Sequence, residues 1–146
     1  MSDAEYFIKC GEAMKRKVKV LFVEDNDISR ELIRRIFKRI QQIDVDVARD
    51  GAEALSLFEA SVYDLVFMDI QLPEMDGFEV TRRIREINHR VNRHTPVIAV
   101  TAFVGNEDQQ RCQDAGMDDY VPKPLNTQDL LKKIEQYTPW TETFNG

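Results

Sequence analysis

The chain has 146 residues, enough for one domain with a single sizeable core. Its composition, 42% hydrophobic and 32% charged, is typical of soluble globular proteins, and the formal net charge of −6 argues against nonspecific nucleic-acid binding. No apolar run is long enough for a membrane span or a signal peptide. The two cysteines, Cys10 and Cys112, lack zinc-type spacing, so we predict a cytoplasmic protein with free thiols and no membrane contact.

Apolar runs and helical periodicities alternate five times between residues 18 and 137. The first run is rich in β-branched residues and ends at the acidic stretch EDND, after which apolar residues recur at every fourth position. The predicted strands cover residues 18–23, 44–48, 64–68 and 95–102, with a short fifth strand within 118–125. The predicted helices cover residues 27–40, 51–60, 77–87, 105–115 and 126–137. Continuous apolar strands separated by helices are typical of a parallel sheet covered on both faces, so the sequence predicts an α/β domain.

The two ends of the chain lie outside this pattern. We interpret residues 1–17 as an N-terminal linker or an extra helix, residues 18–137 as the domain, and residues 138–146 as a loose C-terminal tail. Within the domain, Asn26 or Asp27 is expected to cap the first helix because both side chains can accept hydrogen bonds from free backbone amides.

Polar residues mark the carboxyl ends of four predicted strands. They are Glu24 and Asp25 after the first strand, Asp69 after the third, Thr101 at the end of the fourth and Lys123 after the fifth. Taken singly, each has an ordinary interpretation as a turn cap, a loop acid, a strand residue or a surface charge. Their joint placement favours a site, because ligands of open parallel sheets bind where the carboxyl ends of the strands meet.

The residue types at these positions indicate the chemistry. Three carboxylates at one sheet edge would repel one another, and a divalent cation with few, water-rich oxygen ligands, such as Mg²⁺, removes that conflict. With a hydroxyl from Thr101 and an ammonium from Lys123, the group forms a site for a tetrahedral dianion on Asp69. Since carboxylate nucleophiles form aspartyl-phosphates, the sequence predicts phosphorylation of Asp69 beside Mg²⁺.

Four motifs, VLFVEDN, LVFMDIQLPEMDGFE, VIAVTA and DYVPKPL, occur in this order within residues 17–137. Together they resemble the receiver domain of two-component response regulators. The resemblance implies a flavodoxin-like, doubly wound sheet of five parallel strands in the order 2-1-3-4-5 with five helices. One position departs from the common pattern: the first acid is Glu24, where many receivers have Asp, and a Glu-Asp pair is common in receivers attached to hybrid sensor kinases.

The resemblance also implies a role for each matching residue at the acidic site. Asp69 corresponds to the phosphoacceptor and Asp25 to the direct Mg²⁺ ligand. Glu24 corresponds to the acid that acts through metal-bound water, and the backbone carbonyl of Gln71 to the third protein ligand.

Further matches concern the phosphoryl group and the switch that it drives. Thr101 and Lys123 resemble the pair that binds the phosphoryl oxygens, and Tyr120 matches the aromatic switch position. In this family the threonine shifts toward the phosphoryl group and the aromatic ring rotates into the vacated space, which changes the surface near the fourth helix and fifth strand. The Lys123-Pro124 bond is expected to be cis, as is usual in the family.

The first predicted helix carries more apolar residues than one buried stripe needs. Ile28, Leu32, Ile36 and Ile40 form one ladder, which Ile33 and Phe37 widen. We expect Leu32, Ile33 and Ile36 to be buried in the core. Ile28, next to the acidic residues, is expected to be partly exposed and to help dock a helix of a histidine phosphotransfer protein.

The function implied by the resemblance is that of a phosphoacceptor. The domain takes a phosphoryl group from the phosphohistidine of a histidine kinase or a histidine phosphotransfer protein onto Asp69 and switches its surface for a downstream partner. It is not an enzyme beyond catalysing its own phosphorylation and autodephosphorylation.

Three other functions stay open from the sequence. A phosphatase of the haloacid-dehalogenase type also uses Asp, Mg²⁺, Thr and Lys, but normally has its nucleophile on the first strand and an acid where this chain has Gln71. A flavin or nucleotide binder needs backbone donors from Gly, Ser and Thr, and the first strand here ends instead in EDNDIS. A binding module that works without phosphorylation is the third alternative.

Overall fold

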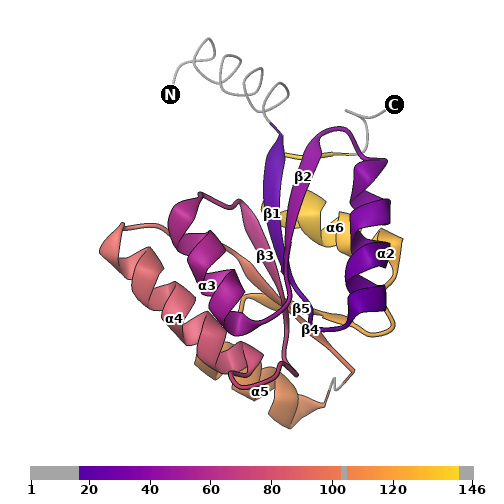
Figure 1. The fold of residues 1–146 in the computed structure, drawn as a ribbon. Coiled ribbons are helices and arrows are strands. Elements are labelled where there is room, and N and C mark those ends of the chain that lie inside the picture. Colours follow the sequence, from indigo (N-terminus) through magenta and orange to yellow (C-terminus); the bar gives the residue numbers. More distant parts are fainter. Residues whose placement is uncertain (1–16, 103–104, 142–146) are drawn as a thin grey trace.

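The computed structural model describes residues 17–102 and 105–141. Strands and helices alternate along these residues (Figure 1). The strands are β1 (Val18–Val23), β2 (Ile43–Ala48), β3 (Leu65–Asp69), β4 (Val97–Thr101) and β5 (Asp119–Pro122). The helices are α2 (Asp27–Lys38), α3 (Gly51–Ala60), α4 (Gly77–Arg90), α5 (Asn106–Ala115) and α6 (Thr127–Tyr137). Each predicted strand and helix is therefore present, with ends that differ by a few residues.

The strands form a single parallel sheet in the order β2-β1-β3-β4-β5, which confirms the predicted flavodoxin-like topology. The chain first runs from β1 to the edge strand β2 and then crosses back to β3 on the other side of β1. The order of the strands reverses at this point, and the carboxyl ends of β1 and β3 lie side by side there. This is the place where open α/β sheets bind their ligands.

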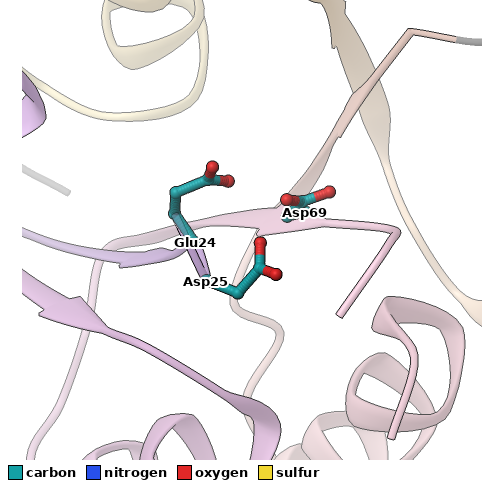
Figure 2. A group of neighbouring side chains, drawn as sticks. All are labelled: Glu24, Asp25 and Asp69. Atoms are coloured by element: carbon teal, nitrogen blue, oxygen red, sulfur yellow. The ribbon is translucent and has the colours of Figure 1, made fainter. Parts of the chain in front are cut away.

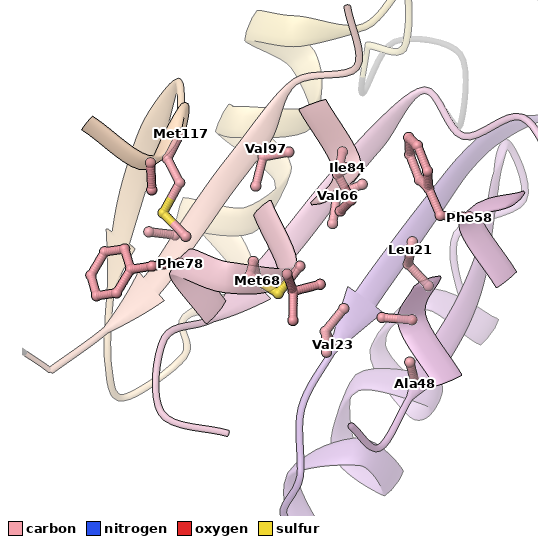
Figure 3. Packing of buried hydrophobic residues seen from close by; sticks show 14 of the residues in the cluster. Leu21, Val23, Ala48, Phe58, Val66, Met68, Phe78, Ile84, Val97 and Met117 are labelled. Atoms are coloured by element: carbon pink, nitrogen blue, oxygen red, sulfur yellow. The ribbon is translucent and has the colours of Figure 1, made fainter. Parts of the chain in front are cut away.

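Helices cover both faces of the sheet, α2 and α6 on one face and α3, α4 and α5 on the other (Figure 1). Alternate residues of each strand supply the two cores, because successive side chains of a strand point to opposite faces. Leu21 and Val23 of β1 pack on the α3–α5 side (Figure 3), and Phe22 packs on the α2–α6 side, where its ring stacks on Phe67 at 5.1 Å. Every residue of β3 is buried, so this strand is held on both faces up to its last residue, Asp69.

Side-chain caps fix where several helices begin, and the predicted cap Asn26 is confirmed. The Asn26 side chain accepts a hydrogen bond from the backbone amide of Ser29 at 2.9 Å. Asp76 in the same way accepts from Glu79 at 2.9 Å and starts α4. These two caps follow β1 and β3, so they set the paths of the two loops at the switch point.

The burial of α2 differs from the prediction. Ile33 is fully buried and Phe37 is 2% exposed, but Ile36 is only partly buried and Leu32 is 48% exposed. Residues four apart share one stripe of a helix, and the stripe through Ile33 and Phe37 is the one that faces the sheet. The predicted core position of Leu32 is therefore wrong, because Leu32, like Ile28 one turn before it, lies on the outer side of α2.

The first residues of the predicted tail pack against the domain. Trp140 is 2% exposed and lies in the same core cluster as Val18, Phe37 and Ile134. Thr138 donates from its hydroxyl to the carbonyl of Ile134 at 2.6 Å and closes the end of α6. Residues 138–141 are therefore not loose, and a single large apolar side chain accounts for the difference.

The predicted linker or extra helix lies almost wholly outside the described residues, as does Cys10. Cys112, on α5, is a buried free thiol, as predicted. Within 17–102 and 105–141, no helix is both long enough and apolar enough to cross a bilayer.

Candidate functional site

Asp69 is held at the end of a fully buried strand and is itself only 2% exposed. One of its carboxylate oxygens, Oδ1, accepts a hydrogen bond from the backbone amide of Gln71 at 3.0 Å. The loop after Asp69 returns close to the strand, where the amide of Gly77 donates to the carbonyl of Ile70 at 2.9 Å. A Cβ atom at position 77 would lie 2.3 Å from the Asp69 carbonyl oxygen, so only glycine permits this approach.

Glu24 and Asp25 reach the same place from the end of β1. The backbone amide of Glu24 donates to the carbonyl of Ala48 at 2.9 Å and so extends the pairing of β1 with β2 by one residue. Glu24 is 3% exposed, whereas Asp25 is exposed. The carboxylates of Glu24, Asp25 and Asp69 face one another (Figure 2), each with an oxygen within 4.8 Å of the others. The structure thus brings together the three acids that the sequence predicted to converge.

Lys123 supplies the cation of the site. Its Nζ lies 3.0 Å from Asp69 Oδ2 and 3.9 Å from Glu24 Oε2. Its backbone amide donates to the carbonyl of Thr101 at 2.9 Å, which ties the residue to the end of β4. The Lys123-Pro124 bond is cis, as expected.

The surroundings of Glu24 suit the binding of a cation. Its Oε2 atom is buried and accepts no hydrogen bond from the described residues. Burial, and after it the neighbouring carboxylate of Asp69, raises the pKa of Glu24 to about 7, while Lys123 acts in the opposite direction. A buried carboxylate oxygen without a donor, next to two more carboxylates, matches the ligands that a hard divalent cation such as Mg²⁺ takes.

Thr101 and Gln71 lie beside the acids. Thr101 ends β4 and is 5% exposed. With Asp25, it lines a cavity of about 670 Å³ that also borders the loop after β3 at Gln71. Arg111 of α5 lines the same cavity, and its Cζ lies 4.5 Å from the centroid of the Phe78 ring. The cavity leaves room for a group larger than a metal ion beside Asp25 and the loop after Asp69.

Tyr120 lies on β5, where it pairs with Ala99, two residues before Thr101 on β4. Its ring is partly buried against the α3–α5 core, and its hydroxyl accepts a hydrogen bond from the Gln109 side chain at 3.4 Å. The structure therefore places the predicted switch residue next to the strand that carries Thr101.

Ile28 is 82% exposed in the first turn of α2, just past the acidic pair. Leu32, one turn further along, is also exposed. The two side chains form an apolar strip on the outer side of α2 that begins at the acidic site. The predicted exposure of Ile28 is thus confirmed.

Arg30 is a residue near the site that sequence reasoning missed. Its guanidinium donates to the backbone carbonyls of Glu24 and Asp25. No motif or periodicity marks an arginine for this contact, because it depends on the path of the loop between β1 and α2 and not on the spacing of residue types.

A family model for the response regulator receiver domain matches residues 20–135. Hybrid signal transduction histidine kinase B of Dictyostelium discoideum is 38% identical over an alignment of 122 residues, and the match covers 77% of this chain and 6% of that protein. The chain thus spans only a small part of this much longer relative. The family model covers the residues that form the acidic site.

Two solved structures show the same fold. One is the receiver domain of the Saccharomyces cerevisiae response regulator Ssk1 in complex with the histidine phosphotransfer protein Ypd1, with a TM-score of 0.76, 30% identity and coverage of 84% of this chain and 90% of that one. The other is the receiver domain of a Pseudomonas aeruginosa sensor histidine kinase with a magnesium ion in its active-site cleft, with a TM-score of 0.73, 33% identity and coverage of 83% and 97%. By the match of the family model and the shared fold, the chain belongs to the response regulator receiver domain family.

Proposed function

We propose that this receiver domain accepts a phosphoryl group from a phosphohistidine on the carboxylate of Asp69. The observation that carries the proposal is the convergence of Glu24, Asp25 and Lys123 on Asp69, with the Lys123 ammonium 3.0 Å from one Asp69 oxygen. A buried carboxylate with an adjacent ammonium and two further acids is built for charge stabilisation during phosphoryl transfer.

In the proposed reaction, an Asp69 oxygen attacks the phosphorus atom as the bond from phosphorus to the donor histidine nitrogen breaks. Lys123 neutralises charge on the equatorial phosphoryl oxygens, and the Thr101 hydroxyl donates a hydrogen bond to one of them. The rigid end of β3 holds the nucleophile in line with the donor. Water later hydrolyses the acyl phosphate and returns Asp69 to the carboxylate.

The residues that would hold Mg²⁺ are Asp25, Asp69 and the backbone carbonyl of Gln71, with Glu24 acting through a metal-bound water. The ion would supply positive charge to the transferring phosphoryl group. The buried Glu24 oxygen, which accepts no hydrogen bond from the described residues, and the clustered carboxylates support this ligand set. The magnesium ion in the active-site cleft of the Pseudomonas aeruginosa receiver domain supports it as well.

The proposed donor is a histidine kinase or a histidine phosphotransfer protein, in line with the complex of the Ssk1 receiver domain and Ypd1. The exposed strip of Ile28 and Leu32 suits a helix of such a protein, because it lies beside the acidic site and offers apolar surface to a partner. The Glu24-Asp25 pair and the similarity to hybrid histidine kinases favour a donor from a phosphorelay.

Phosphorylation is proposed to act through Thr101 and Tyr120. Thr101 would move toward the phosphoryl oxygens, and the Tyr120 ring would turn inward and change the surface near α5 and β5 for a downstream partner. The weak 3.4 Å hydrogen bond from Gln109 supports a ring that is free to move. Ring signals of Tyr120 that stay unchanged in NMR spectra on phosphorylation would contradict this part of the proposal.

Catalysis is proposed to be limited to the domain's own phosphorylation and dephosphorylation. A phosphatase of the haloacid-dehalogenase type is disfavoured because the nucleophile lies on β3 and not on β1. A purely phosphorylation-independent module is disfavoured because the carboxylates of Glu24, Asp25 and Asp69 and the ammonium of Lys123 lie together, a cluster that such a module does not need. A cytoplasmic location and the lack of nucleic-acid binding stay predictions from the sequence.

The test is labelling of the whole chain by a phosphorylated histidine phosphotransfer protein in the presence of Mg²⁺. Asp69→Asn should abolish the label, because an amide oxygen cannot form the acyl phosphate. Asp76→Asn is the matched control, since Asp76 lies in the loop after β3 but serves as a helix cap, a role that asparagine also fills. Labelling of Asp69→Asn at the parental rate would refute the assignment.

A further inference from the structure

Arg30 is an arginine with an unusually buried side chain, only 13% exposed. Its Nη1 donates to the backbone carbonyl of Glu24 at 3.0 Å and to that of Asp25 at 2.7 Å. Its Nη2 pairs with the carboxylate of Asp27. Arg30 therefore contacts the backbone of both acids at the end of β1, and in the described part of the chain it forms no ion pair with either of their carboxylates.

The two carbonyls need a donor because of where they lie. β1 ends its register with β2 at Val23, and the helical hydrogen bonds of α2 begin with the Arg30 amide donating to Asn26. The carbonyls of Glu24 and Asp25 fall between these two ladders, and neither accepts a backbone hydrogen bond among residues 17–102 and 105–141. An unpaired carbonyl is costly where water is excluded, which applies to the buried Glu24, whereas the contact with the Asp25 carbonyl is exposed. Both hydrogen bonds come from the two N–H groups of Nη1, while Nη2 of the same planar guanidinium pairs with Asp27.

We propose that Arg30 is a positioning residue for the metal site: it holds the peptide segment of Glu24 and Asp25 so that their carboxylates are set for Mg²⁺ before the ion arrives. The inference rests on the proposed function in taking Mg²⁺ as the ligand. Without this contact the segment would have to be ordered when the ion binds, which lowers affinity. Groups that orient metal ligands without binding the metal themselves are important for affinity: removing one typically lowers metal affinity by about 10–100-fold.

The geometry assigns the effect to the shape of the guanidinium and not to its charge. The cation next to the carboxylates is Lys123, at 3.0 Å from Asp69 and 3.9 Å from Glu24. Arg30 instead contacts carbonyl oxygens and the exposed carboxylate of Asp27. A lysine at position 30 would keep the charge but could not reproduce the planar set of donors.

The experiment is calorimetric titration of MgCl₂ into the whole chain. Arg30→Ala and Arg30→Lys should both raise the Mg²⁺ dissociation constant by about 10-fold or more. Arg35→Ala is the matched control, because Arg35 lies on the same helix and forms an exposed pair with Glu31. The Mg²⁺ affinity of this variant should stay within about twofold of that of the parent. Far-UV circular dichroism of each metal-free variant verifies that it is folded at the temperature of the titration.

A second readout distinguishes a positioning role of Arg30 from a general loss of activity in the variant. The rate of labelling is measured against Mg²⁺ concentration. Arg30→Ala should raise the half-saturating Mg²⁺ concentration by the same factor as the dissociation constant, with the parental rate restored at saturating Mg²⁺. A lower rate at saturation with unchanged Mg²⁺ dependence would overturn the proposal.

Two calorimetric outcomes would also overturn it: parental Mg²⁺ affinity in Arg30→Ala, or full rescue by Arg30→Lys. These results would leave the proposed function intact, because the parent chain would still bind Mg²⁺ and accept the label. A parent chain that binds no Mg²⁺ would overturn both proposals together.

Discussion

At the scale of single residues, the acidic site places like charges together in a buried position. Glu24 is 3% exposed and Asp69 2% exposed, and each lies within reach of the other and of Asp25. Such a cluster is unfavourable for the folded protein without a metal, and the Lys123 ammonium offsets only part of the repulsion. The cluster of carboxylates therefore lowers the free energy of unfolding of the metal-free protein, and such local destabilisation is common at functional sites.

This conflict predicts the effect of Glu24→Gln on the metal-free protein. The folded state binds a proton on Glu24 more tightly than the unfolded state does, so stability falls as pH rises from about 4.5 through about 7. Removing the charge should raise the free energy of unfolding at pH 8 by about 1–3 kcal/mol, and the gain should vanish at pH 4. Urea unfolding at both pH values measures the effect.

The control for this prediction is Glu31→Gln, since Glu31 lies on the exposed side of α2 and forms an exposed pair with Arg35. It should change the free energy of unfolding by less than about 0.5 kcal/mol. Adding Mg²⁺ should stabilise the parent chain more than Glu24→Gln, because the substitution removes a ligand charge. A Glu24→Gln variant that is less stable than the parent at pH 8 without metal would contradict the account.

At the scale of elements, the switch point depends on how closely α4 approaches the end of β3. Gly77, the first residue of α4, lies where a Cβ atom would be 2.3 Å from the Asp69 carbonyl oxygen and 2.8 Å from the Ile70 Cα. Both obstacles are backbone atoms, which cannot turn aside as a side chain can. The glycine is therefore needed for the position of Asp69 and not for an unusual backbone angle.

Gly77→Ala is predicted to destabilise the fold by about 1–3 kcal/mol, although alanine is normally the better residue in a helix. Gly51→Ala is the matched comparison, because Gly51 also opens a helix after an aspartate cap. Its Cβ would meet a side-chain methyl group of Val80 at 2.7 Å, so its cost should be smaller. Urea unfolding midpoints of the two variants give the comparison. Equal losses of stability would contradict the claim that the close approach of Gly77 to the Asp69 backbone makes this glycine necessary.

The sequence predicted each strand and helix because apolar runs and four-residue periodicities are local signals. It also predicted that the acids after β1 and β3 meet, because parallel topology brings strand ends to one edge. The periodicity of α2 did not separate the buried stripe of Ile33 and Phe37 from the exposed position of Leu32, so the predicted burial of Leu32 is wrong. The contacts of Arg30 and the burial of Trp140 likewise depend on loop paths and on packing between distant segments, which periodicity does not encode.

At the scale of the whole molecule, function depends on where a partner can approach. The acidic site opens at the carboxyl end of the sheet, and the strip of Ile28 and Leu32 begins beside it. Val62 is exposed as well, but it precedes β3 and so lies toward the amino end of the strands. If Asp69 is the phosphoacceptor, as proposed, this apolar strip next to it is the surface that a phosphodonor protein would cover first.

Replacing Ile28 and Leu32 together by serine is predicted to weaken binding of a histidine phosphotransfer protein by roughly 10-fold or more, since two apolar anchors are lost. Labelling by a small-molecule acyl phosphate should be unchanged, because the site itself is intact. Val62→Ser is the control at the other end of the sheet and should leave both properties as in the parent. Equal loss of binding in Val62→Ser would argue against a docking strip on α2.

The most direct measurement locates the phosphoryl group itself. The chain is labelled by a phosphorylated histidine phosphotransfer protein with Mg²⁺, digested under conditions that keep acyl phosphates intact, and mapped by tandem mass spectrometry. The account predicts the phosphoryl group on Asp69, with no label when Mg²⁺ is removed by a chelator. A phosphoryl group on any other residue, or on Asp69 at the same rate without the metal, would contradict it.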